Sequence, residues 1–117
     1  MIKQELLKHL SPREKKAVEE FINGISKIFN QNLLKIILYG SKAEGDFSHD
    51  SDIDILLIVE KIDLSQRKAF FKFLVDIELQ YDSHISPVLV SKKEYEMNKK
   101  MGSFFFHEIE KKGIVLQ

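Results

Sequence analysis

Two apolar segments separated by a polar loop constrain the fold of this chain more than any other feature. Residues 33–39 (LLKIILY) and 52–59 (DIDILLIV) are rich in branched aliphatic side chains, which is typical of β-strands. Residues 40–51 between them are polar, contain two glycines and form a loop of about a dozen residues, too short for a crossover helix. We therefore expect the two strands to pair antiparallel. The second is apolar on both faces, which is typical of a central strand.

Helical patterns surround these strands. Ser11, Pro12 and Glu14 form a capping box that opens a helix over residues 12–29. Its apolar face consists of Ala17, Val18, Phe21, Ile22, Ile25, Ile28 and Phe29. Further helices are expected over 63–81, 91–100 and 103–112, and further strands over 84–90 and 114–116, where Pro87 indicates an edge strand or a bulge. The sequence predicts one α+β domain over residues 1–117, with a small mixed β-sheet flanked by α-helices.

Composition excludes several classes of function. The 117 residues carry 18 Lys and Arg against 18 Asp and Glu, so a protein that binds nucleic acid through bulk positive charge is not indicated. Cysteine is absent, which excludes disulfides, thiolate catalysis and cysteine–zinc sites. No apolar run approaches the roughly 20 residues of a membrane span, and we expect a cytoplasmic protein.

Asp52 and Asp54 are the strongest candidates for metal ligands. Two residues apart on a strand, they share one face and lie roughly 6–7 Å apart along it. Carboxylates at the start of a buried strand are costly unless a charge neutralises them, and oxygen ligands favour Mg²⁺ or Mn²⁺. The alternative interpretation is an exposed strand end at which both aspartates face water.

The loop before the aspartates has the residues of a phosphate-binding turn. Gly40 ends the first strand and lets the backbone turn sharply beside a ligand. Backbone N–H groups of such a turn can form an anion-binding nest, and the Ser41 hydroxyl and Lys42 ammonium are donors suited to phosphate. An ordinary connecting turn with a solvated lysine is the alternative. If the strands pair, the turn and the carboxylates meet at one end of the sheet, where a nucleoside triphosphate with Mg²⁺ would fit.

Gly40-Ser41, ten intervening residues and Asp52-Ile53-Asp54 resemble the signature of the DNA polymerase β-like nucleotidyltransferase superfamily, and the short chain resembles its minimal nucleotidyltransferase (MNT) branch. The resemblance implies that Asp52 and Asp54 are catalytic and hold two Mg²⁺ ions, and that Gly40 and Ser41 bind the β- and γ-phosphates, with Lys42 as a cationic partner. It implies transfer of a nucleoside monophosphate, most simply AMP from ATP, to an acceptor with release of pyrophosphate.

The match departs from the family at two places. The family has a third carboxylate on a following strand, and the aligned position here is Ser86. Asp82 shares the strand parity of Ser86, but its residue type and position also suit a helix–strand turn. Glu44 stands where relatives carry a basic residue, and it would repel a triphosphate unless it points away.

Other candidates carry weaker signals. His49 could touch a nucleotide and His84 could replace a missing base, although exposed or packing histidines are the simpler interpretation. Two of the three consecutive phenylalanines 104–106 are expected in the core, and the third is a candidate for contact with another chain, including a second copy.

A chain of this length has no room for the extra helical domain of larger relatives, so the acceptor is expected to be bound by, or to be, a second protein. MNT proteins are often paired with a HEPN-domain protein. The resemblance therefore implies an antitoxin that attaches AMP to a separate HEPN-type toxin. The alternative is a non-catalytic nucleotide-binding or partner-neutralising module with a degenerate active site, which the missing carboxylate favours.

Overall fold

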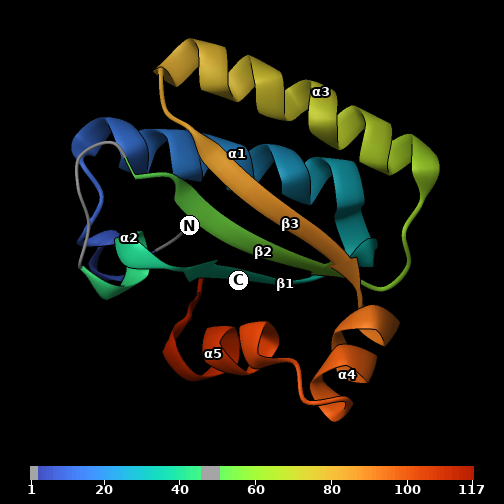
Figure 1. The fold of residues 1–117 in the computed structure, drawn as a ribbon. Helices are drawn as coiled ribbons and strands as arrows, with labels where there is room; N and C mark the ends of the chain where they lie inside the picture. Colours follow the sequence, from blue (N-terminus) through green and yellow to red (C-terminus); the bar gives the residue numbers. More distant parts are fainter. Residues whose placement is uncertain (1–2, 46–50) are drawn as a thin grey trace.

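The computed structural model describes residues 3–45 and 51–117 of the chain, and its elements are drawn in Figure 1. They are η1 (Gln4–Leu7), α1 (Pro12–Phe29), η2 (Asn30–Asn32), β1 (Leu33–Tyr39), α2 (Ser41–Glu44), β2 (Ile53–Val59), α3 (Leu64–Tyr81), β3 (Ile85–Ser91), α4 (Lys92–Lys100), α5 (Phe104–Lys112) and β4 (Ile114–Val115). The order agrees with the sequence-based expectation. One addition is α2, a single helical turn at the start of the segment that was expected to be loop throughout.

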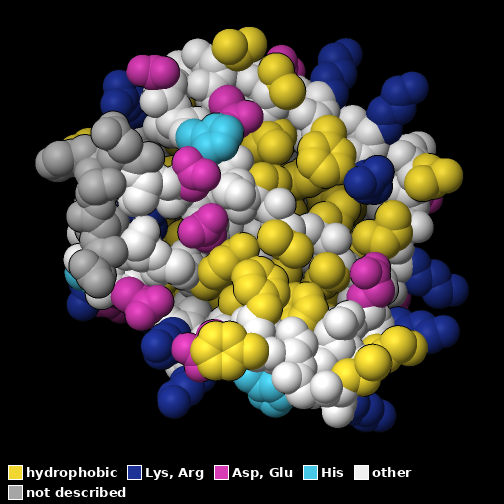
Figure 2. Space-filling view, viewed as in Figure 1, with side chains coloured by type: hydrophobic (Ala, Val, Ile, Leu, Met, Phe, Trp, Pro, Cys, Tyr) yellow, Lys and Arg dark blue, Asp and Glu magenta, His cyan; other side chains and the backbone are white. Residues whose placement is uncertain are grey.

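The sheet has the strand order β3-β2-β1-β4. The expected hairpin is confirmed, because β1 and β2 pair antiparallel with Tyr39 opposite Asp54. The helix α3 carries the chain over to β3, which pairs parallel with β2. As Pro87 indicated, β3 is an edge strand. Figure 2 shows apolar side chains along this edge, between α3 and the α4–α5 pair.

Helices cover both faces of the sheet, which confirms the α+β fold class. Residues 53, 55, 57 and 59 of β2 pack with α1 and α3 in the larger core cluster, whereas residues 56 and 58 pack with Phe106 and Ile109 of α5 on the opposite face. This alternation is the two-residue period of a strand. It places the side chain of Asp54, which has the parity of residues 56 and 58, on the α4–α5 side at the end of β2.

Close packing of α1 against α3 explains a glycine in the middle of α1. A Cβ built on Gly24 would lie 2.0 Å from Cζ of Phe73 on α3, so the missing side chain makes room for that ring. Phe73 also stacks on Phe21 at a centroid distance of 6.3 Å. Ala69 has the helical spacing of the buried face of α3 but is exposed, whereas Phe70, Leu74 and Ile77 are buried.

The three consecutive phenylalanines are divided between core and surface. Phe106 is buried, Phe105 is half-exposed and packs edge-on against Tyr39 at 5.6 Å, and Phe104 is 77% exposed. The expectation of two core phenylalanines therefore holds fully only for Phe106.

Within residues 3–45 and 51–117, no helix is both long and apolar enough to cross a membrane.

Candidate active site

The two aspartates lie at the start of the central strand. Asp52 immediately precedes β2 and its side chain is 46% exposed, while Asp54 is the second residue of the strand and is partly buried. Asp54 lies between Tyr39 of β1 and Ser86 of β3 in the strand register. The carboxylates are therefore held by the most buried strand of the sheet, at an end that remains open to a ligand.

The Gly40 turn lies directly against Asp54. Gly40 has a φ of +76°, and a Cβ built on it would be 2.5 Å from Oδ2 of Asp54. The next turn closes when the amides of Ala43 and Glu44 donate to the Gly40 carbonyl, each at 3.1 Å. The amides of Ser41 and Lys42 precede these bonds, at the positions where a helix start presents N–H groups to a ligand. The structure thus brings together the two halves of the motif.

Negative charge accumulates at this end of the sheet. Burial and the neighbouring charge of Asp52 raise the pKa of Asp54 above its ordinary value. Burial and the charge of Asp54 likewise raise the pKa of the Tyr39 phenol. Both shifts show an environment that disfavours a further anion unless a cation is bound. Hard oxygen ligands in such surroundings suit a divalent cation such as Mg²⁺ or Mn²⁺, so the residues present fit the metal that the sequence predicted.

Within residues 3–45 and 51–117, no third carboxylate joins the pair. Ser86 lies beside Asp54 in the β2–β3 register, at the position aligned with the family's third acid. Asp82 instead ends α3 with a left-handed backbone, is 94% exposed and lies 3.8 Å from Arg13, as expected for a turn residue. In the part of the chain that the structure describes, no group of three or more acidic or histidine side chains is arranged to hold a metal.

His84 lies beside the aspartates and has an acidic neighbour that sequence reasoning missed. Its Nε2 is 3.8 Å from Oδ2 of Asp52, and its Nδ1 is 2.6 Å from Oε2 of Glu78 on α3. The Glu78 oxygen is buried and makes no well-aligned hydrogen bond within the described residues. The contact is therefore an ion pair that exists when the imidazole is protonated. Helical spacing marks Glu78 as an ordinary α3 residue, so only the tertiary structure shows this contact.

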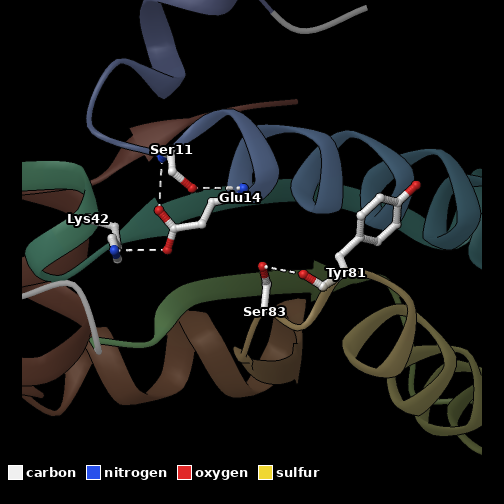
Figure 3. A network of polar contacts seen from close by, with 5 residues as sticks. All are labelled: Ser11, Glu14, Lys42, Tyr81 and Ser83. Atoms are coloured by element: carbon white, nitrogen blue, oxygen red, sulfur yellow. Dashed lines mark hydrogen bonds and ion pairs between the residues drawn. The ribbon is translucent and has the colours of Figure 1, made fainter.

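The Lys42 side chain is buried, unlike that of a surface lysine that binds phosphate. Its side chain is only 1% exposed, and its Nζ lies 2.9 Å from Oε2 of Glu14 on α1 (Figure 3). The interpretation of Lys42 as a solvated lysine is therefore wrong, and its ammonium is already engaged by a carboxylate.

Glu44 is exposed on α2. His49 lies outside the described residues.

Two cavities flank this end of the molecule. One, of about 690 Å³, is mainly polar and is lined by Lys8, His9, Leu10, Ser11, Arg13, Glu14, Lys42, Ser51, Asp82, Ser83 and His84. The other, of about 250 Å³, is mainly apolar and is lined by Tyr39, Gly40, Glu44, Phe104, Phe105, Glu108, Ile109 and Lys112. The first adjoins Asp52 through Ser51 and His84, and the second includes the Gly40 turn itself. The linings of these cavities include neither Asp52 nor Asp54, so both cavities lie next to the aspartates and not around them.

Comparison with known proteins identifies the family. The model of the family described as "Polymerase beta, Nucleotidyltransferase" matches residues 23–117, most of the chain, and the chain belongs to this family. Two proteins of Methanocaldococcus jannaschii, provisionally named protein adenylyltransferases, are similar: one is 32% identical over 83% of this chain and 92% of its own length, the other 35% identical over 88% and 97%. The chain is a nucleotidyltransferase of the minimal type.

Solved structures show the same fold. A provisionally named nucleotidyltransferase from Sulfolobus solfataricus superimposes with a TM-score of 0.52 and 17% identity, covering 86% of this chain and 76% of that one. A mutant of the toxin–antitoxin MntA–HpeT gives a TM-score of 0.52 and 19% identity, covering 85% of this chain and 72% of that one. At these identities the likeness supports the fold alone, and it confirms the expected nucleotidyltransferase fold.

Proposed function

We propose that this nucleotidyltransferase transfers AMP from ATP to a hydroxyl group of a separate protein. The observation that supports the proposal is the contact between the Gly40 turn and Asp54, which brings the turn proposed to bind phosphate next to one of the two carboxylates. The names of the M. jannaschii relatives support a protein as acceptor and adenylate as the transferred group. The toxin–antitoxin neighbour in the structure comparison supports an antitoxin role. The acceptor is proposed to be a HEPN-type toxin, because the resemblance to the MNT branch implies such a partner.

In the proposed reaction the acceptor oxygen forms a bond to the α-phosphorus of ATP while the bond from that phosphorus to the bridging oxygen breaks. Pyrophosphate leaves and the hydroxyl proton is released to water. Ser41 and the backbone amides of the turn hold the β- and γ-phosphates, which become the leaving group, and keep the triphosphate in line with the acceptor.

Asp52 and Asp54 would hold the divalent cations, proposed to be two Mg²⁺ ions. A bound divalent cation neutralises phosphate charge and favours the ionised form of the acceptor hydroxyl. Burial and the charge of Asp52 both raise the pKa of Asp54, so a cation bound by the two carboxylates would favour their ionised forms. Ser86 supplies no charge at the third position, so affinity for a second ion is expected to be lower than with three carboxylates.

The absence of an acidic side chain at Ser86 favours a second candidate function. In this alternative the chain binds Mg²⁺–ATP without turnover and neutralises a partner protein by covering it. Asp52 and Asp54 then serve binding alone. Both functions bind Mg²⁺–ATP at the same turn and aspartates, but covering the partner protein requires neither, and the two functions differ in whether AMP is transferred.

The proposed function is tested by incubating the protein with Mg²⁺, ATP labelled at the α-phosphate and the protein encoded by the neighbouring gene. We expect label on that protein, none when the label is at the γ-phosphate, and none with Asp52→Ala plus Asp54→Ala. Tight binding of the partner without label, unchanged by these substitutions, would instead support the neutralising module.

Ser86→Asp is expected to strengthen metal binding. The new carboxylate would stand beside Asp54 at the spacing of neighbouring strands, about 4.8 Å, and added ligand charge raises affinity for divalent cations. We expect Mn²⁺ to bind about tenfold more tightly, as measured by isothermal titration calorimetry. Ser86→Asn is the matched control, because it adds similar bulk without charge. Equal Mn²⁺ affinity of the Asp and Asn variants would contradict a third ligand position at residue 86.

A further inference from the structure

The charged side chain of Lys42 is buried although the sequence suggests a surface lysine. Among the described residues, Lys42 and Ser83 are the buried polar side chains, and Lys42 is the charged one of the two. Its ammonium lies 2.9 Å from Glu14, whose own side chain is 15% exposed. Taking two charges out of water costs several kcal/mol per ion, and the attraction between them often only offsets that cost. Net stability is therefore a weak explanation for this pair.

Glu14 connects the start of α1 to the turn that carries Gly40 and Ser41. Its Oε1 accepts a hydrogen bond from the Ser11 amide at 2.9 Å, while its Oε2 accepts one from Lys42 (Figure 3). The same carboxylate thus completes the capping box of α1 and holds the middle of α2. Burial by itself raises the pKa of Glu14, but the bonds from Ser11 and Lys42 outweigh it, so the pKa lies below its ordinary value and the carboxylate is ionised at neutral pH.

A second contact joins the same two segments. Gly45 ends α2 with a φ of +85°, and a Cβ built on it would lie 2.7 Å from Cε1 of His9, so the imidazole packs directly on this glycine. His9, Ser11 and Glu14 all precede residue 23, where the match to the family model begins. The N-terminal segment therefore supports α2 from outside the matched part of the chain.

A four-residue helix needs such support. Helices shorter than about 12 residues are marginal in water. Among the described residues, the backbone bonds that close α2 run from Ala43 and Glu44 to Gly40 and from Gly45 to Ser41. Gly40 packs directly against the Asp54 carboxylate. A shift of this turn would therefore change the position of the Ser41 and Lys42 amides relative to the aspartates. Where α2 sits thus decides whether the two halves of the site face one ligand.

We propose that Glu14 and Lys42 are positioning residues, which fix the Gly40–Ser41 turn against Asp54 and thereby set the affinity for the triphosphate. The triphosphate part of this inference rests on the proposed function, whereas the positioning of the turn does not.

The competing role for Lys42 is direct contact with a phosphate, as the sequence suggested. The two roles make opposite predictions for Glu14→Gln. If Lys42 binds phosphate directly, neutralising Glu14 releases the ammonium and tightens nucleotide binding. If the pair positions the turn, the same change weakens it.

The test measures two quantities in Glu14→Gln, Lys42→Met and the charge-free double variant. The first is hydrogen exchange of the Ala43, Glu44 and Gly45 amides, compared with the global unfolding free energy from urea titration. The second is calorimetric affinity for α,β-methylene-ATP with Mg²⁺, together with affinity for Mn²⁺ alone. Glu20→Gln is the matched control, because it makes the same charge change at an exposed position of α1.

We expect each single variant to speed exchange of the three amides about tenfold beyond any global change, and to weaken nucleotide binding about tenfold. The double variant should be no weaker than the single ones, since both remove the same link. Mn²⁺ affinity should be unchanged, because the aspartates are untouched, and Lys42→Arg should restore part of the nucleotide affinity. If Glu14→Gln does not fold, the double variant, which leaves no unpaired buried charge, decides the question.

Unchanged protection of the α2 amides, or nucleotide binding that is unchanged or tighter in Glu14→Gln, would overturn the positioning role. Failure of the wild-type protein to bind the nucleotide would instead count against the proposed function. Amide exchange alone would then decide whether the ion pair holds the turn.

Discussion

Asp54→Asn is expected to abolish nucleotidyl transfer while making the protein more stable. Asp54 is a metal ligand in the proposed function, and loss of such a ligand removes several kcal/mol of transition-state stabilisation, a decrease on the order of 10³-fold or more in rate. The gain in stability follows from the raised pKa of Asp54, caused by burial and by Asp52. The ionised, partly buried Asp54 is thus expected to lower the free energy of unfolding of the wild-type protein.

The sign of the pH dependence follows from that shift. Because the pKa of Asp54 is higher in the folded than in the unfolded state, its ionisation penalises the folded state. The penalty is absent below the ordinary pKa and complete above the raised one, so wild-type stability falls as pH rises through this interval. Asp54→Asn removes this fall. The free energy of urea unfolding, measured between pH 3 and pH 8 without divalent cations, checks it.

Divalent cations should reverse the order of stability. Mn²⁺ at about 100 times its dissociation constant stabilises a folded protein by about 2.7 kcal/mol, and only the wild type should gain this. Asp76→Asn, at an exposed position of α3, is the control and should respond to Mn²⁺ as the wild type does. Equal stabilisation of Asp54→Asn by Mn²⁺ would show that the cation binds elsewhere.

Gly40→Ala is expected to separate the two halves of the site. A backbone with φ +76° and ψ −160° is essentially restricted to glycine and costs a residue with a Cβ about 1–3 kcal/mol. Here the Cβ would also lie 2.5 Å from the Asp54 carboxylate. Either the turn or the aspartate must move, because the two atoms cannot share that space. We therefore expect loss of Mg²⁺–ATP binding and of transfer activity, together with weaker Mn²⁺ binding, all measurable by calorimetry and the label-transfer assay.

Gly102→Ala is a matched control for the backbone. Gly102 has a φ of +83°, but a Cβ built on it meets nothing within 4 Å. It should cost a similar free energy of unfolding, about 1–2 kcal/mol, and leave ligand binding intact. If both variants lose stability equally and Gly40→Ala still binds nucleotide with wild-type affinity, the Gly40 turn is not part of the nucleotide site.

Local patterns predicted much of this fold because they depend on neighbouring residues. The capping box at Ser11 forms as expected, and a second one forms at Ser91, since each needs only a hydroxyl and a glutamate three residues later. The β1–β2 hairpin follows from two apolar strands joined by a short loop. The interpretation of Pro87 as an edge-strand residue depends only on its missing N–H group.

Helical periodicity did not predict burial correctly where burial depends on which other helix packs against the surface. Ala69 has the helical spacing of a buried residue but faces solvent, because the width of the α1–α3 contact decides how much of α3 is covered. Gly24 has a low helix propensity within α1, and it is the place where the Phe73 ring packs.

The sequence alone determined the chemistry available to the site: two carboxylates with one strand parity, a glycine able to adopt a positive φ, and a hydroxyl beside it. Tertiary structure decided which of these groups contact one another and which neighbouring side chains are buried away from solvent. The β2–β3 register places Ser86 beside Asp54, and Glu14 draws Lys42 into the interior. Contact and burial of this kind depend on segments distant in the chain, and desolvation by those segments gives the same side chain a different chemical role.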